Sequence, residues 1–324
     1  MFIIKNVDIM HKVTPGNTDL SISPIVLGGN VFGWTLSEKE SFGILDAALE
    51  LGIDTIDTAD IYSHWAPGNV GGESETIIGK WMKERGNRDG MTIITKVGGS
   101  MGTGEKNVSA NYILKQVETS LRRLQIDQID LYFTHWDDNK TPVEETLEAY
   151  QKLILGGKIR YIGASNLTPE RLKASLNASK EHHLPRYEVF QPGYNLYDRN
   201  EFEEGVGPIC KEYGLGVITY YSLASGFLSG KYRSEHDFIK SVRGGAMKKY
   251  LNNRGQRILN ALDQIARERR VSQAAVSLRW LIQNPLVTAP IASATSREQL
   301  NAFAQAMKIV LTSDEIHLLM QASD

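Results

Sequence analysis

Short apolar runs alternate with longer segments of helical periodicity along most of the chain. Runs of this length are typical of buried strands, whereas an apolar residue every three or four positions is typical of an amphipathic helix. The predicted strands are residues 24–27, 54–57, 92–96, 129–134, 159–163, 188–191, 216–220 and 287–291. The clearest predicted helices are residues 37–52, 109–124, 143–155, 169–179 and 257–269. Ser37 to Glu40 form a capping box at the start of the first helix, and Gly52 ends its pattern.

Strands that alternate regularly with helices predict a parallel sheet. We expect this sheet to close into a (β/α)8 TIM barrel that forms a single domain over residues 1–324. Such a barrel needs about 250 residues. The surplus is assigned to an N-terminal β-hairpin within residues 1–22 and to a long loop after the seventh strand, residues 224–254. The alternative is a doubly wound open sheet, but residues 27–33 do not supply its Gly-x-Gly-x-x-Gly turn.

The composition gives no sign of nucleic acid or membrane as a partner. Charged residues make up 23% of the chain, and the formal net charge is −2. No stretch approaches the roughly 20 apolar residues that span a bilayer, and the N-terminus does not resemble a secretory signal. The single cysteine, Cys210, fits a reducing compartment. We expect a soluble cytoplasmic protein, and the sequence does not indicate its oligomeric state.

Four proton-active residues follow successive strands. Asp57, Lys96 and His135 lie at or near strand ends, and Tyr62 lies in the loop just after Asp57. Taken singly, these residues have ordinary structural explanations, such as a turn cap, a packed ring or a solvent-facing amine. In a parallel barrel, however, the strand ends meet at one face, which is the face that carries the chemistry. The set therefore predicts one catalytic site.

The residue types predict acid catalysis at a carbonyl group. The ordinary pKa of tyrosine, near 10, is too high for easy proton exchange at neutral pH, and the ammonium of Lys96 is expected to lower it. Asp57 is expected to keep a buried Lys96 charged. Tyr62 can then donate a proton to a developing alkoxide, and His135 can orient the carbonyl oxygen. None of the four can supply a hydride, so a cofactor is expected to do so.

The next three strand ends are suited to a nicotinamide. Ser165, Asn166 and Gln191 offer amide and hydroxyl groups for a carboxamide, and Tyr220 offers a flat ring for stacking. Phosphate groups are expected further along the chain, after the seventh strand and at the start of a helix that we take to be the last one. For the second of these places a plain helix cap is the alternative. The phosphate-binding candidates are Leu223, Ser225, Lys231, Ser293, Thr295, Arg297 and Gln299.

Several long segments resemble the aldo-keto reductases, and the resemblance covers nearly the whole chain. Residues 52–62 resemble the first signature of that family, residues 129–136 the second and residues 157–166 the third. Residues 191–195 and 220–232 also match. The resemblance implies a (β/α)8 barrel that reduces aldehydes or ketones with NAD(P)H, NADP(H) being expected before NAD(H). It also implies a catalytic tetrad of Asp57, Tyr62, Lys96 and His135, in which Tyr62 is the proton donor.

Three departures from the family pattern concern the cofactor. This chain reads Tyr-Tyr-Ser-Leu at residues 220–223, where the family commonly has Tyr-Ser-Pro-Leu. Residues 292–295 replace the usual last phosphate motif, and Arg297 is the candidate cation for a 2′-phosphate. Ala302 and Phe303 stand where the family often has an acidic residue and an asparagine near the adenine.

The substrate is not indicated by the sequence. Trp34, Trp65 and Trp136 follow strand ends near the tetrad, where they either wall a pocket for a sugar-like or hydrophobic carbonyl compound or simply pack the barrel mouth. A rival function is a cofactor-sensing regulatory protein, since the same fold forms the β-subunit of potassium channels. A weaker rival is a metal-dependent hydrolase, for which few His and carboxylate ligands are suitably placed.

Overall fold

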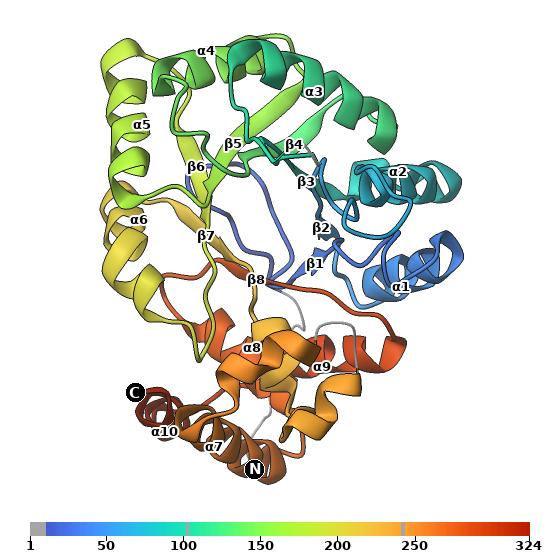
Figure 1. Cartoon of the computed structure of the whole chain (residues 1–324), viewed down its shortest axis with the longest axis vertical. Coiled ribbons are helices and arrows are strands. Elements are labelled where there is room, and N and C mark those ends of the chain that lie inside the picture. The colour runs from blue at the N-terminus through green and yellow to red at the C-terminus, as the bar shows by residue number, and fades with distance from the viewer. Residues whose placement is uncertain (1–10, 102–103, 241–243) are drawn as a thin grey trace, which may run out of the picture.

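The computed structural model describes residues 11–101, 104–240 and 244–324. Its eight strands are parallel and close into a barrel in chain order, with β8 paired to β1 (Figure 1). The strands are β1 Val26–Gly28, β2 Thr55–Asp57, β3 Thr92–Val97, β4 Ile129–Thr134, β5 Ile159–Ser165, β6 Tyr187–Gln191, β7 Gly216–Thr219 and β8 Ala289–Ala292. Each predicted strand overlaps one of these, so the (β/α)8 barrel is confirmed and the open sheet is wrong.

Helices surround the barrel in Figure 1. They are α1 Glu38–Glu50, α2 Glu73–Arg85, α3 Ala110–Leu124, α4 Val143–Leu155, α5 Pro169–His182, α6 Gly207–Tyr213, α7 Asn253–Arg269, α8 Gln273–Gln283, α9 Arg297–Lys308 and α10 Ser313–Ser323. α1 to α8 lie between successive strands, and α9 and α10 follow β8. The predicted capping box at the start of α1 is present, with Ser37 and Glu40 bonded to each other's backbone.

Two helices correct the sequence-based prediction. α9 is not the last helix, because α10 follows it and packs against α7 outside the ring (Figure 1). α2 was not assigned from the sequence. Its N-cap residue is Gly72, which offers no side chain to bond the first backbone N–H groups, so the usual start signal is missing.

The barrel interior is filled by apolar side chains from the strands and from the segment before β1. They are Leu20, Ile22, Val26, Ile94, Leu131, Phe133, Val189, Ile218, Ala289 and Ile291. The barrel is therefore a packed core, and a ligand can reach the strand ends only from outside.

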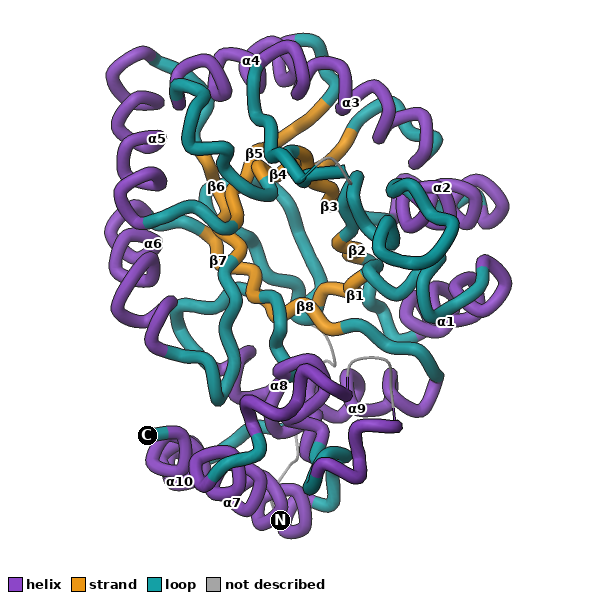
Figure 2. Tube along the Cα trace, viewed as in Figure 1, coloured by secondary structure: helices purple, strands orange, loops and turns teal. Residues whose placement is uncertain are grey.

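The predicted N-terminal hairpin is borne out by one antiparallel bridge, between Val13 and Ile22, and residues 1–10 lie outside the described residues. Gly16 takes a φ of 60° in the turn. An added Cβ there would lie 2.1 Å from the backbone oxygen of Glu188 and 2.9 Å from the backbone nitrogen of Gly216. The turn therefore packs against the starts of β6 and β7, and in Figure 2 its trace crosses the centre of the barrel. It closes the end of the barrel opposite the predicted catalytic face.

The long loop after β7 contains three short 3-10 helices within its described part. These are η3 Ala224–Ser229, η4 Glu235–Lys240 and η5 Gly244–Tyr250. Tyr232, Met247 and Tyr250 are buried, so the loop packs on the barrel although its sequence lacks a clear helical period.

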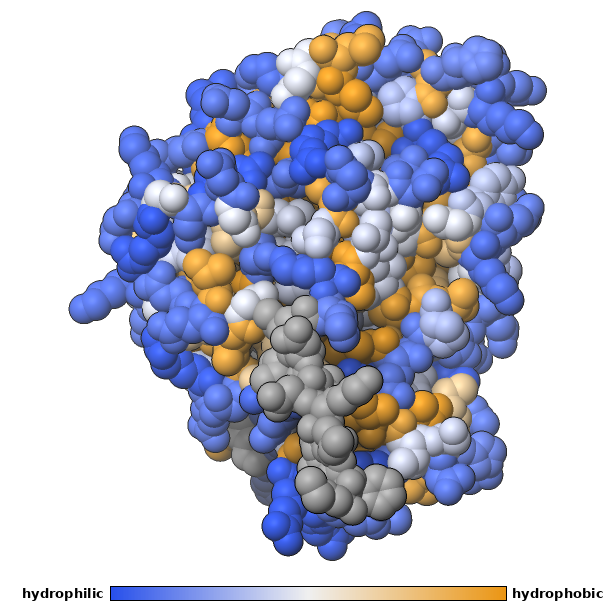
Figure 3. Space-filling view, turned by 180° about the vertical axis from the view of Figure 1, so that it is seen from behind, coloured by the Kyte–Doolittle hydropathy of each residue, from blue (hydrophilic) through white to orange (hydrophobic). Residues whose placement is uncertain are grey.

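Hydrophilic side chains cover most of the face that Figure 3 shows from behind, with hydrophobic side chains between them in several groups. Over residues 11–101, 104–240 and 244–324, the longest apolar helices fall short of what is needed to cross a bilayer.

Candidate functional site

The four proton-active residues meet at the carboxyl ends of three neighbouring strands. Asp57 ends β2, Lys96 is the next-to-last residue of β3, and His135 directly follows β4. The register pairs Lys96 with Phe133, so His135 lies two residues beyond the level of Lys96 on the neighbouring strand. Lys96 is 0% exposed and Asp57 1%. Buried charges at adjacent strand ends require pairing, and the site supplies it.

Lys96 is the centre of a hydrogen-bonded triangle. Its Nζ donates to Asp57 Oδ2 at 2.7 Å and to the Tyr62 hydroxyl at 2.9 Å. A third bond runs to the backbone oxygen of Thr58 at 2.7 Å, so all three protons of the ammonium are used. The Tyr62 hydroxyl donates to Asp57 Oδ2 at 3.2 Å. The geometry fixes the tyrosine hydroxyl beside a buried cation, as the sequence predicts.

The charge balance of the triangle differs from the prediction in one respect. Burial lowers the pKa of Lys96, and the neighbouring Asp57 carboxylate opposes this effect. Burial, followed by the charge of Asp57, raises the pKa of Tyr62 well above its ordinary value. The expectation that Lys96 lowers the pKa of Tyr62 is therefore wrong for this state of the site. Tyr62 stands as a neutral phenol, which is the form that donates a proton.

His135 is a neutral imidazole in this setting. Burial and then the positive charge of Lys96 lower the pKa of His135 well below its usual value. Its ring lies 5.9 Å from the Tyr62 ring and stacks on Trp136 with a centroid separation of 3.7 Å. Its Nδ1 is buried and has no hydrogen-bond partner within the described part of the chain. A neutral imidazole at this place can donate one hydrogen bond to an oxygen above Tyr62.

We expect His135 to make folding stability depend on pH. Below about pH 6.5 the unfolded chain protonates this histidine and the folded chain does not, so stability falls by up to about 1.4 kcal/mol per pH unit. The His135→Gln variant is then expected to show a shallower fall of unfolding free energy between about pH 6.5 and pH 5, measured by urea titration. His182→Gln, on the exposed end of α5, is the matched control. Equal slopes for wild type and His135→Gln would contradict the buried neutral imidazole.

The predicted nicotinamide residues form one chain of hydrogen bonds. Tyr220 OH donates to Asn166 Oδ1 at 2.8 Å, and Asn166 Nδ2 donates to Ser165 Oγ at 3.0 Å and to the backbone oxygen of His135 at 2.9 Å. Ser165 Oγ donates to the backbone oxygen of Gln191 at 2.8 Å. Asn166 has a φ of 54°, which turns the chain sharply at the end of β5. The side chains of Tyr220, Asn166 and Ser165 are thus held in fixed orientations next to the backbone of Gln191.

Gln191 joins this chain to the tetrad. Its Nε2 donates to Asp57 Oδ1 at 2.9 Å, while Asp57 Oδ2 receives the bond from Lys96. Within the described residues, no hydrogen bond reaches the Gln191 Oε1. One oxygen of Asp57 therefore serves the proton-active residues and the other orients Gln191. The amide oxygen of Gln191 is left to accept a bond from a ligand amide.

The three predicted tryptophans surround the tetrad. Trp34 and Trp65 meet edge to face at 5.5 Å, and Trp65 lies 6.1 Å from the Tyr62 ring. Trp136 stacks on His135. Trp65 is 41% exposed, which leaves part of its ring open to a ligand. His64, which sequence reasoning missed, packs on Trp65 at 5.4 Å. In the sequence, a histidine next to a tryptophan in a predicted loop is not enough to mark it as a candidate site residue.

The residues that are predicted to bind the phosphate groups of a cofactor lie in two separate segments. Leu223, Ser225 and Lys231 lie in or next to η3, where Ser225 has a φ of 55° and Gly226 one of 101°. Across the described residues, no hydrogen bond joins this segment to residues 293–299.

In the second segment, side-chain bonds occupy several of the predicted groups. Ser293 Oγ donates to Asn30 Oδ1 at 2.6 Å, and Thr295 N donates to Gln299 Oε1 at 2.9 Å. Arg297 forms an ion pair with Glu50 at 3.3 Å, in which each side chain is 66% exposed. An ion pair this exposed is weak, so Arg297 can turn to another anion at little cost.

Ala302 and Phe303, where the sequence departs from the family pattern, both lie on the buried side of α9. Neither side chain is available to contact an adenine from that position.

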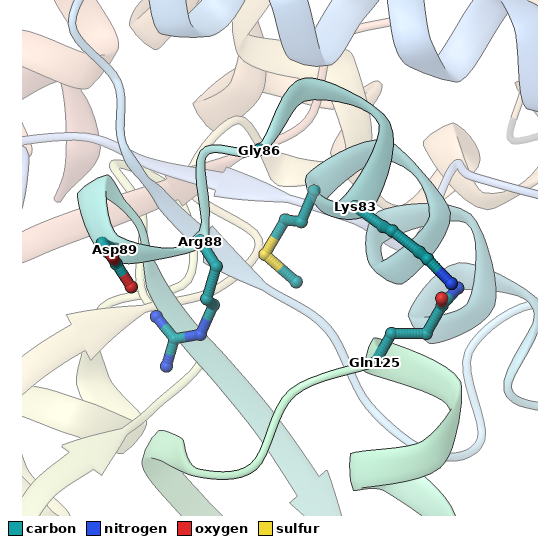
Figure 4. A pocket seen from close by; sticks show the side chains of 6 residues that line it. Lys83, Gly86, Arg88, Asp89 and Gln125 are labelled. Carbon is teal, nitrogen blue, oxygen red and sulfur yellow. The ribbon is translucent and has the colours of Figure 1, made fainter.

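A cavity of about 380 Å³ lies elsewhere, at the ends of α2 and α3 (Figure 4). Gly86 and Gln125, which line it, are the residues that end these two helices. The helices run antiparallel to the strands, so this cavity is at the opposite end of the barrel from the tetrad. Arg88 in its wall is engaged by Asp130 and by two backbone oxygens. No part of the predicted site reaches it.

Within the described ranges, no group of three or more His, Cys, Asp or Glu side chains is arranged to hold a metal ion.

A model of the Aldo/keto reductase family matches residues 24–324. The oxidoreductase YrpG of Bacillus subtilis, itself described as uncharacterized, is 34% identical over 314 residues, which cover 94% of this chain and 93% of that protein. The aldo-keto reductase YhdN of the same organism is 34% identical over 295 residues, with 89% of this chain and 85% of that protein covered.

Two further similarities carry other names. A probable voltage-gated potassium channel subunit beta of rice, Oryza sativa, is 32% identical over 305 residues, covering 91% of this chain and 90% of that protein. The solved structure of a glycerol dehydrogenase from Gluconobacter oxydans superposes with a TM-score of 0.82. It is 26% identical and covers 96% of this chain and 94% of that chain.

Proposed function

The chain belongs to the aldo/keto reductase family of oxidoreductases, and we propose that it reduces an aldehyde or ketone to an alcohol with NADPH. The observation that carries this proposal is the triangle of Asp57, Tyr62 and Lys96, in which the phenol hydroxyl lies 2.9 Å from a buried ammonium. A phenol so placed is an acid aimed out of the strand ends, and a carbonyl oxygen is the group that requires such an acid when it is reduced.

Tyr62 is the proton donor in this proposal. As negative charge develops on the carbonyl oxygen, the tyrosine proton moves to it, and the phenolate that forms is stabilised by the ammonium 2.9 Å away. The high pKa of Tyr62 in the resting site keeps the proton in place until then. Lys96 thus favours the transition state more than the ground state.

His135 orients the substrate and Asp57 holds the site together. The low pKa of His135 keeps its imidazole neutral, so that it can donate a hydrogen bond to the carbonyl without taking the proton of Tyr62. Asp57 compensates the charge of Lys96 and fixes Gln191 with its second oxygen.

The hydrogen-bonded residues at the ends of β5, β6 and β7 fit a nicotinamide. The Gln191 Oε1 and the Ser165 hydroxyl can bond to the carboxamide, and the half-buried ring of Tyr220 can stack on the pyridine. Asn166 connects Ser165 and Tyr220 to the backbone of His135. When bound, the cofactor supplies the hydride, and these side chains determine where it is delivered.

NADP(H) is the proposed cofactor in preference to NAD(H). The pyrophosphate is assigned to the backbone and side chains of Leu223, Ser225 and Lys231. The 2′-phosphate is assigned to the start of α9, where Ser296 caps the helix and Arg297 is held only by an exposed ion pair. Ser293, Thr295 and Gln299 complete this proposed surface.

Replacing Arg297 with alanine is expected to weaken NADPH binding roughly tenfold and to leave NADH binding unchanged, because a charge-assisted bond to the 2′-phosphate is lost. Fluorescence titration with each cofactor measures both effects. Arg257→Ala, an exposed arginine on α7, is the control for loss of one surface charge. A parallel loss of both affinities would place the 2′-phosphate elsewhere.

The substrate pocket is assigned to Trp34, Trp65 and Trp136 around Tyr62. Aromatic walls suit either the apolar faces of a sugar-like compound or a hydrophobic aldehyde. The glycerol dehydrogenase named above acts on a small polyol, which favours including polyols and their aldehydes in any substrate panel.

The similarity to a potassium channel subunit supports a second candidate, a cofactor-sensing regulatory protein with weak reductase activity. The two functions share the tetrad and the cofactor groups, so turnover separates them. A titration with NADPH and NADH followed by a panel of carbonyl compounds is the direct test. A reductase is expected to turn over at least one compound at about 1–10³ per second. Tight NADPH binding with no substrate above trace rates would favour the sensor.

A further inference from the structure

The ring of Tyr220 is held from behind by a short segment that has no side chain in the proposed chemistry. This segment, Pro192–Asn195, follows β6 and bridges to Tyr220. Tyr220 N donates to the backbone oxygen of Pro192 at 2.9 Å, and Tyr194 N donates to the backbone oxygen of Tyr220 at 3.1 Å. The backbone of Tyr220 is therefore fixed on both sides before its ring meets any ligand.

Gly193 sets the distance at which the Tyr220 ring packs against this segment. A Cβ added to Gly193 would lie 3.2 Å from Cζ, 3.3 Å from Cε2 and 3.3 Å from the hydroxyl oxygen of Tyr220. These approaches are tighter than almost all real contacts of a Cβ, so the ring would have to move by a few tenths of an ångström. The ring can rest at its present height only because residue 193 has no side chain. Gly193 does not have a positive φ, so space alone accounts for the glycine.

Asn195 fixes the chain directly after Tyr220. Its side chain is fully buried, and its Oδ1 accepts from the backbone nitrogens of Tyr197 and Asp198 at 2.8 and 2.9 Å. Its Nδ2 donates to the backbone oxygen of Tyr221 at 3.1 Å. Tyr221 has a φ of 55°, so this bond holds the residue after Tyr220 in a conformation that side-chain-bearing residues seldom adopt.

The hydroxyl end of the Tyr220 ring is also held by a hydrogen bond. Tyr220 OH donates to Asn166 Oδ1, and Asn166 also bonds to Ser165 and to the backbone of His135. A shift of the ring would therefore be transmitted to the proposed carboxamide groups and to the strand end that carries His135. In its present position the ring satisfies the contacts with Gly193, with Asn166 and with the Tyr221 backbone together.

We propose that Gly193 and Asn195 are positioning residues that fix the height of the Tyr220 ring and thereby the distance of the nicotinamide from the substrate carbon above Tyr62. The inference rests on the proposed function, in which Tyr220 is the stacking surface. Neither residue contacts the cofactor or the substrate in this account. Their effect passes through the ring, because hydride transfer depends steeply on the separation of the reacting atoms.

Gly193→Ala tests the contact with the ring. Misplacement by a full ångström can cost about 10²-fold, so a shift of a few tenths is expected to lower kcat roughly three- to tenfold. NADPH affinity is expected to fall by a similar factor, while KM for the carbonyl substrate stays within about twofold, since that site is untouched. Gly43→Ala is the matched control, because its Cβ would meet nothing within 4 Å.

Asn195→Ala provides the second variant. Loss of a buried amide lowers the melting temperature in any account, so the informative measurements are made on the folded protein at 25 °C. The expected result is weaker NADPH binding and a lower kcat with KM for the carbonyl retained. A residue that only stabilises the fold would lower the melting temperature and leave all three constants unchanged.

The two proposals fail in different ways. If wild type and both variants bind NADPH equally and share one kcat, the positioning role is overturned and the reductase stands. If the wild type neither binds NADPH nor reduces any carbonyl compound, the proposed function is overturned and the positioning role with it.

Discussion

Tyr62→Phe is expected to lower kcat by roughly 10³-fold while NADPH binds as tightly as to the wild type, because general acid catalysis contributes about 10²–10⁴-fold. The substitution removes one oxygen and keeps the ring, so contacts with Trp65 and His135 remain. Lys96 loses one of its three acceptors but keeps Asp57 and the Thr58 carbonyl. The loss should therefore appear in turnover and hardly in stability. Single-turnover reduction of the best aldehyde, with NADPH in excess, measures it.

Tyr150→Phe is the matched control for this result. Tyr150 is buried outside the barrel, and its hydroxyl bonds to Thr134 at 2.7 Å, so the same oxygen is removed from a hydrogen-bonded tyrosine away from the tetrad. We expect this variant to lose some stability and to retain its activity. If Tyr62→Phe reduced the aldehyde as fast as Tyr150→Phe, the proton would have to come from another group, and His135 would be the next candidate.

The barrel and the tetrad could be predicted because their signals are local. Each strand is a short apolar run, and Asp57, Lys96 and His135 each follow one directly, so the topology of a parallel barrel brings them together. The bond from Gln191 to Asp57 could not be predicted in this way. It joins residues 134 positions apart, and only the closed ring of strands places them within 2.9 Å.

The sequence predicts a lowered pKa for Tyr62 whereas the structure raises it, and the reason for this difference is related. The sequence indicates which charges are near a group, but the shift depends on how deeply the hydroxyl is buried and on which charge it bonds to. In the structure the Tyr62 hydroxyl donates to Asp57 while it accepts from Lys96, and burial acts in the same direction as Asp57. In the proposed mechanism Lys96 therefore acts on the developing phenolate rather than by ionising the resting tyrosine.

A residue whose proposed role is to leave room for a neighbouring ring gives no signal in the sequence. Gly193 reads as an ordinary turn glycine, and its proposed role rests on the 3.2 Å that separates an added Cβ from the Tyr220 ring. Tyr221 is 60% exposed beside that ring, with centroids 5.0 Å apart. The unusual Tyr-Tyr pair was visible in the sequence, but it pointed to the pyrophosphate loop and not to the wall of the stacking site.

Lys96→Met is expected to have the largest effect on stability, together with loss of turnover. The variant leaves the Asp57 carboxylate buried with Gln191 and Tyr62 as hydrogen-bond donors and without its cation. Breaking a buried ion pair from one side costs about 3–5 kcal/mol of unfolding free energy. Urea unfolding at pH 7 measures this loss. Asp57→Asn should cost less, because burial already lowers the pKa of Lys96 and the lysine can become a neutral amine once the carboxylate is gone.

The double variant Lys96→Met/Asp57→Asn separates charge balance from catalysis. Asparagine keeps one acceptor oxygen, which can take the bond from Gln191, and its amide nitrogen can donate to the Tyr62 hydroxyl, so neither substituted residue is charged. Most of the stability lost in Lys96→Met should therefore return, because the cost of the single change lies in the uncompensated charge. Turnover should stay as low as in Lys96→Met, since no cation faces the phenolate of Tyr62. A double variant that is no more stable than Lys96→Met would mean that packing around the lysine stem, rather than its charge, holds this part of the barrel together.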